Sequence, residues 1–242
     1  MSFYKVTYSA KFRRLTVYNY GCNFHCLTCF YRARKPSPPA SFLSLKTFAE
    51  IVMKNRQNIE RIHFLGGEPT INPALPEFLA LCKREFGLKT FLGHTNGSLL
   101  PLPHLDGANV GVKAFSDQLH RRITGFPGSI VLNNIKQAFA VGLELKVNMI
   151  LIPHLVWYDE IEGMSEFLAS LDPGIPLHIQ GYYPVPNGPK RAPEKNELIE
   201  AVQRAKRYLT NVDYVLVDHN RIFNRPVMDE RFRVEVIWPS TI

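Results

Sequence analysis

Short apolar stretches alternate with amphipathic segments along most of the chain. Six stretches have the β-branched and aromatic composition typical of strands, at residues 15–20, 61–65, 89–94, 109–115, 144–152 and 176–181. Segments with apolar residues three or four positions apart predict helices at residues 45–57, 74–85, 130–141, 159–171 and 195–208. This alternation is typical of β–α–β units, in which the strands pair in parallel and helices cover the sheet. The pattern therefore predicts an α/β fold.

The number of these units predicts an open sheet. A closed eight-stranded barrel takes about 250 residues with all eight repeats, and this chain offers about six. We expect an open, partial (β/α)6 TIM-like barrel with a parallel sheet over residues 1–210. Residues 211–242 start strand-like and then become rich in Arg, and we expect a short C-terminal extension of the same domain. Because ligands bind at the carboxyl ends of parallel strands, the loops after residues 20, 65, 94, 115, 152 and 181 should surround one site.

The net charge of +8 is unevenly distributed. Residues 1–49 contain eight Lys and Arg side chains and no Asp or Glu, so the rest of the chain sums to zero. This excess surrounds a group of cysteines. It is either a solvated basic face or a field that attracts an acidic electron donor, an acidic substrate or a nucleic acid.

The sequence contains no membrane-spanning pattern. No segment approaches the roughly 20 apolar residues that a span requires, and the first residues lack the apolar core of a signal peptide. We expect a cytoplasmic protein, in whose reducing surroundings clustered cysteines indicate a metal site or catalysis rather than a disulfide.

Three of the four cysteines lie within eight positions, in the stretch GCNFHCLTCFY. A structural zinc site needs four ligands. His25 would strain so short a loop, and Cys82 shares a predicted helical face with apolar residues, so zinc is disfavoured. A four-iron cluster ordinarily takes four thiolates. Three thiolates from Cys22, Cys26 and Cys29 would leave one iron open to a small molecule.

The spacing C-x3-C-x2-C directly after a first strand resembles the signature of the radical S-adenosylmethionine (SAM) enzymes. FLGGEPT (64–70) resembles the GGE motif of that family, and HTNG (94–97) resembles its T-N-G turn. The stretches from VGVKAFSDQLHRRITG to IPLHIQGYYPVP are similar to the branch related to pyruvate formate-lyase activating enzymes. The ordered matches cover about residues 15–190.

The resemblance implies a role for individual residues. Cys22, Cys26 and Cys29 would bind three irons of a [4Fe-4S] cluster, and the fourth iron would bind the amino and carboxylate groups of SAM. Lys113, at the end of the fourth predicted strand, would lie near the methionine carboxylate. The implied cofactor-binding residues are Phe30, Gly66, Gly67, Glu68, Thr95, Asn96, Lys113, Asn148, Ile150 and His178.

Some positions depart from the family pattern. Thr28 stands where the family usually has an aromatic residue against adenine, and Phe30 or Tyr31 would take over that contact. His94 and Gly111 replace two acids, which puts a cation site beside the cofactor in doubt. The Asp-Gly-Pro-Gly segment of glycyl-radical enzyme activases is missing ahead of the cluster.

The expected function is reductive cleavage of SAM to a 5′-deoxyadenosyl radical, which abstracts hydrogen from a small-molecule or protein substrate. An anionic electron donor such as flavodoxin or ferredoxin would be the partner. One alternative is a tRNA-modifying enzyme, in which phosphates would be contacted by Arg13, Arg14, Arg32, Arg34 and Lys35. The others are a deazaguanine-forming enzyme and a non-catalytic iron–sulfur electron carrier. HNRIFNR (219–225) would cover the barrel mouth, with Arg221 or Arg225 meeting an anion of the substrate.

Overall fold

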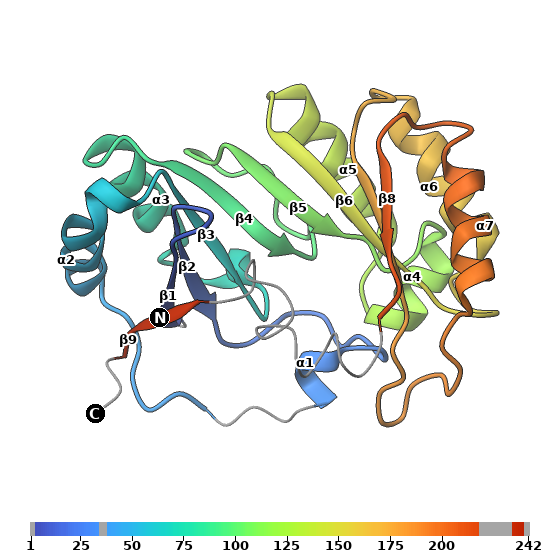
Figure 1. Ribbon diagram of the computed structural model, residues 1–242, viewed down its shortest axis with the longest axis horizontal. Coiled ribbons are helices and arrows are strands. Elements are labelled where there is room, and N and C mark those ends of the chain that lie inside the picture. Colours follow the sequence, from blue (N-terminus) through green and yellow to red (C-terminus); the bar gives the residue numbers. More distant parts are fainter. Residues whose placement is uncertain (1–2, 34–37, 218–233, 240–242) are drawn as a thin grey trace.

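One mixed sheet organises the chain. The computed structural model describes residues 3–33, 38–217 and 234–239. Its nine described strands are hydrogen-bonded in the order β8-β7-β6-β5-β4-β3-β2-β1-β9, and the sheet does not close into a barrel (Figure 1). The parallel strands are β2 (Arg14–Asn19), β3 (Arg61–Gly66), β4 (Lys89–Thr95), β5 (Gly107–Gly111), β6 (Glu144–Leu151), β7 (Leu177–Gly181) and β8 (Val212–Val215). The predicted α/β fold with an open, partial barrel is confirmed.

The edges of the sheet extend beyond the six predicted strands. β1 (Phe3–Ser9) pairs antiparallel with β2, and β9 (Glu235–Trp238) pairs antiparallel with β1. β8 adds a further parallel strand beside β7. The described parts of residues 211–242 therefore supply a strand at each edge of the sheet. Arg221 and Arg225 lie outside the described residues.

The helices run along the convex face of the sheet (Figure 1). The predicted ones are present as α2 (Leu45–Asn55), α3 (Leu75–Arg84), α5 (Gly128–Ala140), α6 (Tyr158–Ala169) and α7 (Lys195–Ala205). Two short helices at the carboxyl ends of the strands were not predicted, α1 (Phe30–Ala33) and α4 (Asp117–Thr124). Short 3-10 turns cover Arg56–Asn58 and Pro69–Ile71. Within the described residues, no helix combines the length and apolarity needed to cross a membrane.

Alternation of side chains gives the two faces of the sheet different chemistry. On β6, Leu145, Val147, Met149 and Leu151 are buried under the helices. Lys146, Asn148 and Ile150 point to the opposite, concave face, because successive side chains of a strand alternate. The concave face is thus free to carry a polar site.

An aromatic cluster fixes the first half of the sheet to its helices. Phe3 of β1 and Phe64 of β3 have ring centroids 5.5 Å apart, and both pack with Phe78 of α3. Phe78 also lies 4.8 Å from Phe48 of α2, between ring centroids. Each ring is buried. Buried aromatic side chains of this size dominate core energetics, so Phe78 holds the two helices and two strands together.

Replacing Phe78 by Ala should lower the free energy of unfolding by about 3–5 kcal/mol, because the substitution removes a buried ring and leaves a cavity. Met53→Ala on α2 is the control, since Met53 is 68% exposed and a surface change typically stays within about 0.5 kcal/mol. Urea unfolding followed by circular dichroism measures both. Equal losses of unfolding free energy in the two variants would contradict this role of Phe78.

Candidate active site

The cysteine loop follows β2 and is anchored to the end of α4. The backbone N–H groups of His25 and Leu27 donate to the carbonyls of Thr124 and Ile123, at 2.9 and 3.0 Å. These carbonyls lie in the last turn of a helix, where carbonyls have no partner within the helix. Phe24 packs beneath the loop against the ring of Phe126, with centroids 4.9 Å apart. The unpredicted helix α4 therefore shapes the loop.

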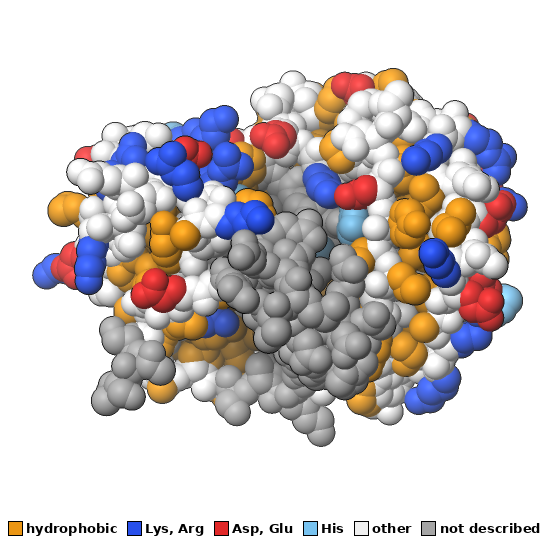
Figure 2. Space-filling model, in the orientation of Figure 1, with side chains coloured by type: hydrophobic (Ala, Val, Ile, Leu, Met, Phe, Trp, Pro, Cys, Tyr) orange, Lys and Arg blue, Asp and Glu red, His pale blue; other side chains and the backbone are white. Residues whose placement is uncertain are grey.

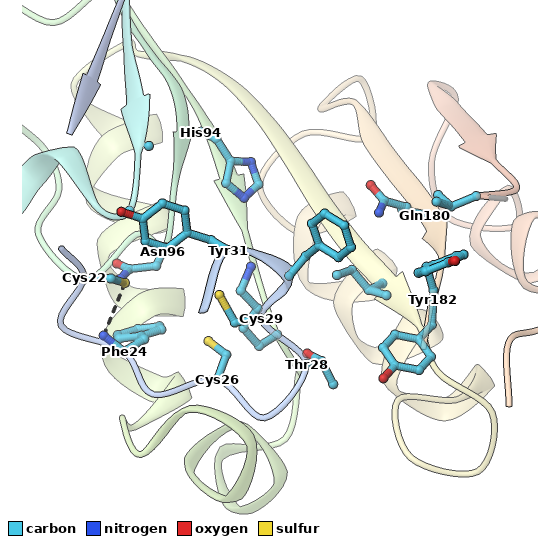
Figure 3. A pocket seen from close by; sticks show the side chains of 17 residues that line it. Cys22, Phe24, Cys26, Thr28, Cys29, Tyr31, His94, Asn96, Gln180 and Tyr182 are labelled. Atoms are coloured by element: carbon cyan, nitrogen blue, oxygen red, sulfur yellow. Dashed lines mark hydrogen bonds between the residues drawn. The ribbon is translucent and has the colours of Figure 1, made fainter. Parts of the chain in front are cut away.

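The thiols of Cys22, Cys26 and Cys29 face one cavity of about 430 Å³ (Figure 3). Two of the sulfur atoms also accept backbone hydrogen bonds, Cys22 from Phe24 at 3.4 Å and Cys29 from Arg32 at 3.4 Å. The cavity is also lined by six other predicted residues, namely Phe30, Gly66, Gly67, Asn96, Lys113 and Ile150. Segments far apart in the sequence thus meet at the carboxyl ends of the strands, as the parallel sheet requires.

Gly66 and Gly67 bring the end of β3 against the start of the cysteine loop. Gly66 has a φ of +117°, and a Cβ there would lie 2.3 Å from the carbonyl oxygen of Asn19. A Cβ on Gly67 would lie 1.9 Å from the carbonyl oxygen of Gly21. The Gly67 and Glu68 N–H groups donate to those same carbonyls at 2.9 and 2.8 Å. The glycines therefore serve close backbone packing, which is independent of any ligand.

Glu68 lies beneath the cavity floor instead of lining it. Its fully buried carboxylate accepts from the Thr70 hydroxyl and the Thr95 hydroxyl, both at 2.7 Å, and from the Asn96 N–H at 2.5 Å. Burial raises the pKa of Glu68, and these hydrogen bonds oppose that shift. Thr95 is likewise buried under the floor. Direct contact of Glu68 or Thr95 with the cofactor stays a prediction.

Asn96 connects this network to the cysteines. Its side-chain amide donates to Asn23 Oδ1 at 2.8 Å and lies 3.9 Å from Cys22 Sγ. The GGE and TNG segments and the cysteine loop are therefore one hydrogen-bonded unit.

Asn148 and His178 line a second, adjoining cavity of about 400 Å³. The two cavities share His94, Lys113, Ile150 and Gln180. His178 Nδ1 lies 2.6 Å from Asp213 Oδ1, and Lys146 Nζ lies 3.7 Å from Asp213 Oδ2. Asn148 donates to Asn109. All the predicted polar residues of β6 and β7 thus face the hollow of the sheet.

Lys113 lies two residues beyond the end of its strand, which is a correction to the sequence prediction. β5 ends at Gly111, and the chain then turns toward α4 because Glu160 accepts the backbone N–H groups of Phe115 and Ser116, at 2.5 and 2.9 Å. The Lys113 side chain still lines both cavities. It lies beside His94, whose Nε2 is only 2.8 Å from where a Cβ of Gly111 would be.

Several cavity residues were not predicted. Gln180 and Tyr182 stand across the cavity from the cysteines (Figure 3). Tyr183 also lines the cavity, and Phe30 meets it edge to face at 6.4 Å between ring centroids. Gln180, Tyr182 and Tyr183 lie at the end of β7 or directly after it. Because ligands bind at the carboxyl ends of parallel strands, their position in the sequence could have identified them. Asp213 had no such signal, because it lies 35 residues from His178 and pairs with it only through the sheet.

The donor set fits an iron–sulfur cluster. Three thiols face one cavity, and the thiolates of a cluster each bind a separate iron. Burial raises the pKa of Cys26 to about 11 and also raises that of Cys22. These thiols are therefore protonated without metal, and binding must release their protons. Cys82 is buried in α3, away from the cavity.

Comparison with known proteins identifies the family. The model of the radical SAM superfamily matches residues 16–168. The chain belongs to this superfamily. A radical SAM enzyme acts with SAM and an iron–sulfur cluster, so these two are the cofactors of the protein.

Individual relatives agree with this placement. The chain is 30% identical over 209 residues to a Methanocaldococcus jannaschii protein whose name assigns it to the glycyl-radical enzyme activating enzymes, covering 82% of this chain and 79% of that one. It is also 30% identical over 149 residues to a GTP 3′,8-cyclase of Vibrio atlanticus, covering 55% of this chain and 44% of the cyclase. The predicted likeness to the activating-enzyme branch is confirmed.

A solved structure agrees in fold. Streptococcus suis SuiB bound to S-adenosylmethionine superimposes with a TM-score of 0.64 at 18% identity, over 83% of this chain and 49% of SuiB. The chain thus spans about half of SuiB, and the likeness concerns the fold alone.

Gly67→Ala should cost about 3 kcal/mol or more, because the new methyl group overlaps backbone that cannot move aside. It should also reduce iron bound after anaerobic reconstitution, since it displaces the cysteine loop. Gly174→Ala is the control, because a Cβ there would meet only the side-chain carboxyl group of Asp172, with the nearest oxygen at 3.0 Å. Urea unfolding and iron analysis test both effects. A stable Gly67→Ala protein with normal iron content would disprove this role.

His94 should remain neutral at physiological pH. The His94 side chain lines the cavity and is accessible to solvent there. Desolvation by the protein around the cavity, followed by the nearby charge of Lys113, lowers its pKa to about 3. Lys113→Met should therefore raise the His94 pKa, though not to 6.5, because desolvation remains. Titration of the histidine ring resonances by NMR, with His94→Gln for assignment, measures the shift. A His94 pKa near 6.5 in the unaltered protein would refute the prediction.

Proposed function

We propose that this enzyme cleaves SAM reductively at a [4Fe-4S] cluster held by Cys22, Cys26 and Cys29, and directs hydrogen abstraction at a substrate on the concave face. The observation that carries the proposal is the convergence of three thiols, the Gly66–Gly67 turn and Lys113 on one cavity. When bound, the cluster supplies the electron that breaks a carbon–sulfur bond of SAM, giving methionine and a 5′-deoxyadenosyl radical. The protein supplies orientation and exclusion of water.

The cavity residues fit the parts of SAM. The Lys113 ammonium would attract the methionine carboxylate, and the backbone of Gly66 and Gly67, which lines the cavity beside the cysteines, would meet the amino group. Ile150, Phe30 and Tyr183 form apolar walls for adenine. Asn148 and His178 offer polar atoms to the ribose from the adjoining cavity.

His178 would be held in one orientation by Asp213. If its Nδ1 donates to the carboxylate at 2.6 Å, then Nε2 is left as a hydrogen-bond acceptor. Such an acceptor suits a ribose hydroxyl. The role of Asp213 is therefore to position His178.

The substrate is a small molecule held on the concave face or a residue of a partner protein. The two adjoining cavities on the concave face support a small-molecule substrate. The activating-enzyme relative supports the second. The N-terminal positive charge supports an anionic electron donor such as flavodoxin or ferredoxin.

Anaerobically reconstituted protein, reduced with dithionite and supplied with SAM, should form 5′-deoxyadenosine. Cys26→Ala should abolish the product, because it removes one thiolate of the cluster. Cys82→Ala is the matched control and should retain activity, since Cys82 is buried in α3. Chromatography measures the product. Iron-independent product formation, or full activity of Cys26→Ala, would refute the proposal.

A further inference from the structure

Two arginines lie side by side on the concave face, at the end of the sheet opposite the cysteines. Arg14 of β2 and Arg61 of β3 are register partners in parallel strands, so their backbones are about 4.8 Å apart. Arg61 and His63 point away from Ile62 and Phe64, which are buried under the helices. This places them on the face that also carries Asn148 and Ile150.

The charge of this pair is poorly compensated. Nε of Arg14 and Nε of Arg61 are buried without a hydrogen-bond partner, and so is Nε2 of His63. The nearby Glu60 pairs with Arg13 at 2.8 Å and reaches Arg61 only at 4.0 Å. Within the described residues, Arg14 has no carboxylate partner and lies over the Phe12 ring, at 4.7 Å.

The surroundings do not neutralise the pair either. Burial, and then the charges of Arg14 and Arg61, lower the pKa of His63 to about 3, so its ring is neutral. Lys5 adds a further cation on the same face, with Nζ 4.1 Å from the centre of the Tyr18 ring. Figure 2 shows Lys and Arg side chains gathered on one side of the central hollow. Two adjacent guanidinium groups whose buried Nε–H donors have no partner are the features of an anion site.

The pair is within reach of a molecule that also meets the cofactor. β3 runs from Arg61 to Gly66, which lines the cysteine cavity. Five steps along a strand span about 17 Å. The positions between them on the concave face, His63 and Leu65, form a continuous path along the sheet.

We propose that Arg14 and Arg61 bind a phosphate group at the far end of an extended small-molecule substrate. Two guanidinium groups match the charge of a phosphate, which is about −1.5 to −2 at neutral pH, and each offers a fork of donors to its oxygens. Two adjacent guanidinium groups on one strand pair suit a single terminal phosphate better than the repeated phosphates of a nucleic acid backbone. Assigning this phosphate to the substrate rests on the proposed function, whereas the anion site itself does not.

Binding of inorganic phosphate and pyrophosphate to the reconstituted enzyme, measured by isothermal titration calorimetry, tests the site without turnover. Arg14→Gln and Arg61→Gln should each weaken binding roughly tenfold, as expected for the loss of a charge-assisted hydrogen bond. Arg13→Gln removes the same charge at the same edge but from an ion pair with Glu60, and it should bind normally. Thermal unfolding of each variant checks its folding.

Two further arms make the test decisive. Arg14→Lys and Arg61→Lys keep the positive charge but lose the paired N–H donors of the guanidinium group, and should bind phosphate with intermediate affinity. These variants replace the Gln variants if those fail to fold. A short single-stranded oligonucleotide should not compete with pyrophosphate. Absence of phosphate and pyrophosphate binding, equal loss in Arg13→Gln, or competition by the oligonucleotide would overturn the proposal. A 5′-deoxyadenosine assay on the same samples reports separately on the proposed function.

Discussion

The buried carboxylate of Glu68 is the interaction on which the site depends. A carboxylate without solvent is costly unless hydrogen bonds compensate it, and here the donors come from Thr70, Thr95 and Asn96. Thr70 follows β3, whereas Thr95 and Asn96 lie at the end of β4 and directly after it, so satisfying the charge fixes the ends of two strands at once. The side-chain amide of Asn96 also donates to Asn23, and this hydrogen bond fixes the cysteine loop. The GGE and TNG segments, which resemble cofactor-binding motifs, therefore also hold the loops of the site in place.

The division between the two faces of the sheet explains where chemistry is possible. The convex face is committed to apolar packing by residues such as Phe64 and Val147. The concave face needs no such packing and carries Arg61, His63, Lys146, Asn148 and His178. A protein interior of this polarity would be expensive if it were closed and dry. Within the described residues, the sheet does not close over this face. The incomplete closure of the sheet therefore explains why its concave face can carry polar side chains.

Much of this arrangement could be predicted from local sequence. Polar and apolar residues alternate in ELKVNM, which predicts both β6 and the face that carries Asn148. The cysteine spacing predicts a shared cavity because all three thiols belong to one short loop. Helix α4 was missed because it is short and strongly charged, with Leu119 and Ile123 as its few apolar positions. Asp213 could not be predicted from local pattern, because only the pairing of β7 with β8 brings it to His178.

The environment of Lys113 shows how substitutions at separate positions depend on one another. His94 can occupy its place only because Gly111 has no Cβ, which would lie 2.8 Å from the imidazole. Desolvation and Lys113 keep that imidazole uncharged. Within the described residues, Lys113 forms no ion pair with an acid, so the neutral ring leaves its positive charge uncompensated. An ammonium group in a cavity is stabilised by an anionic partner, and the carboxylate of SAM is the partner that we propose for it.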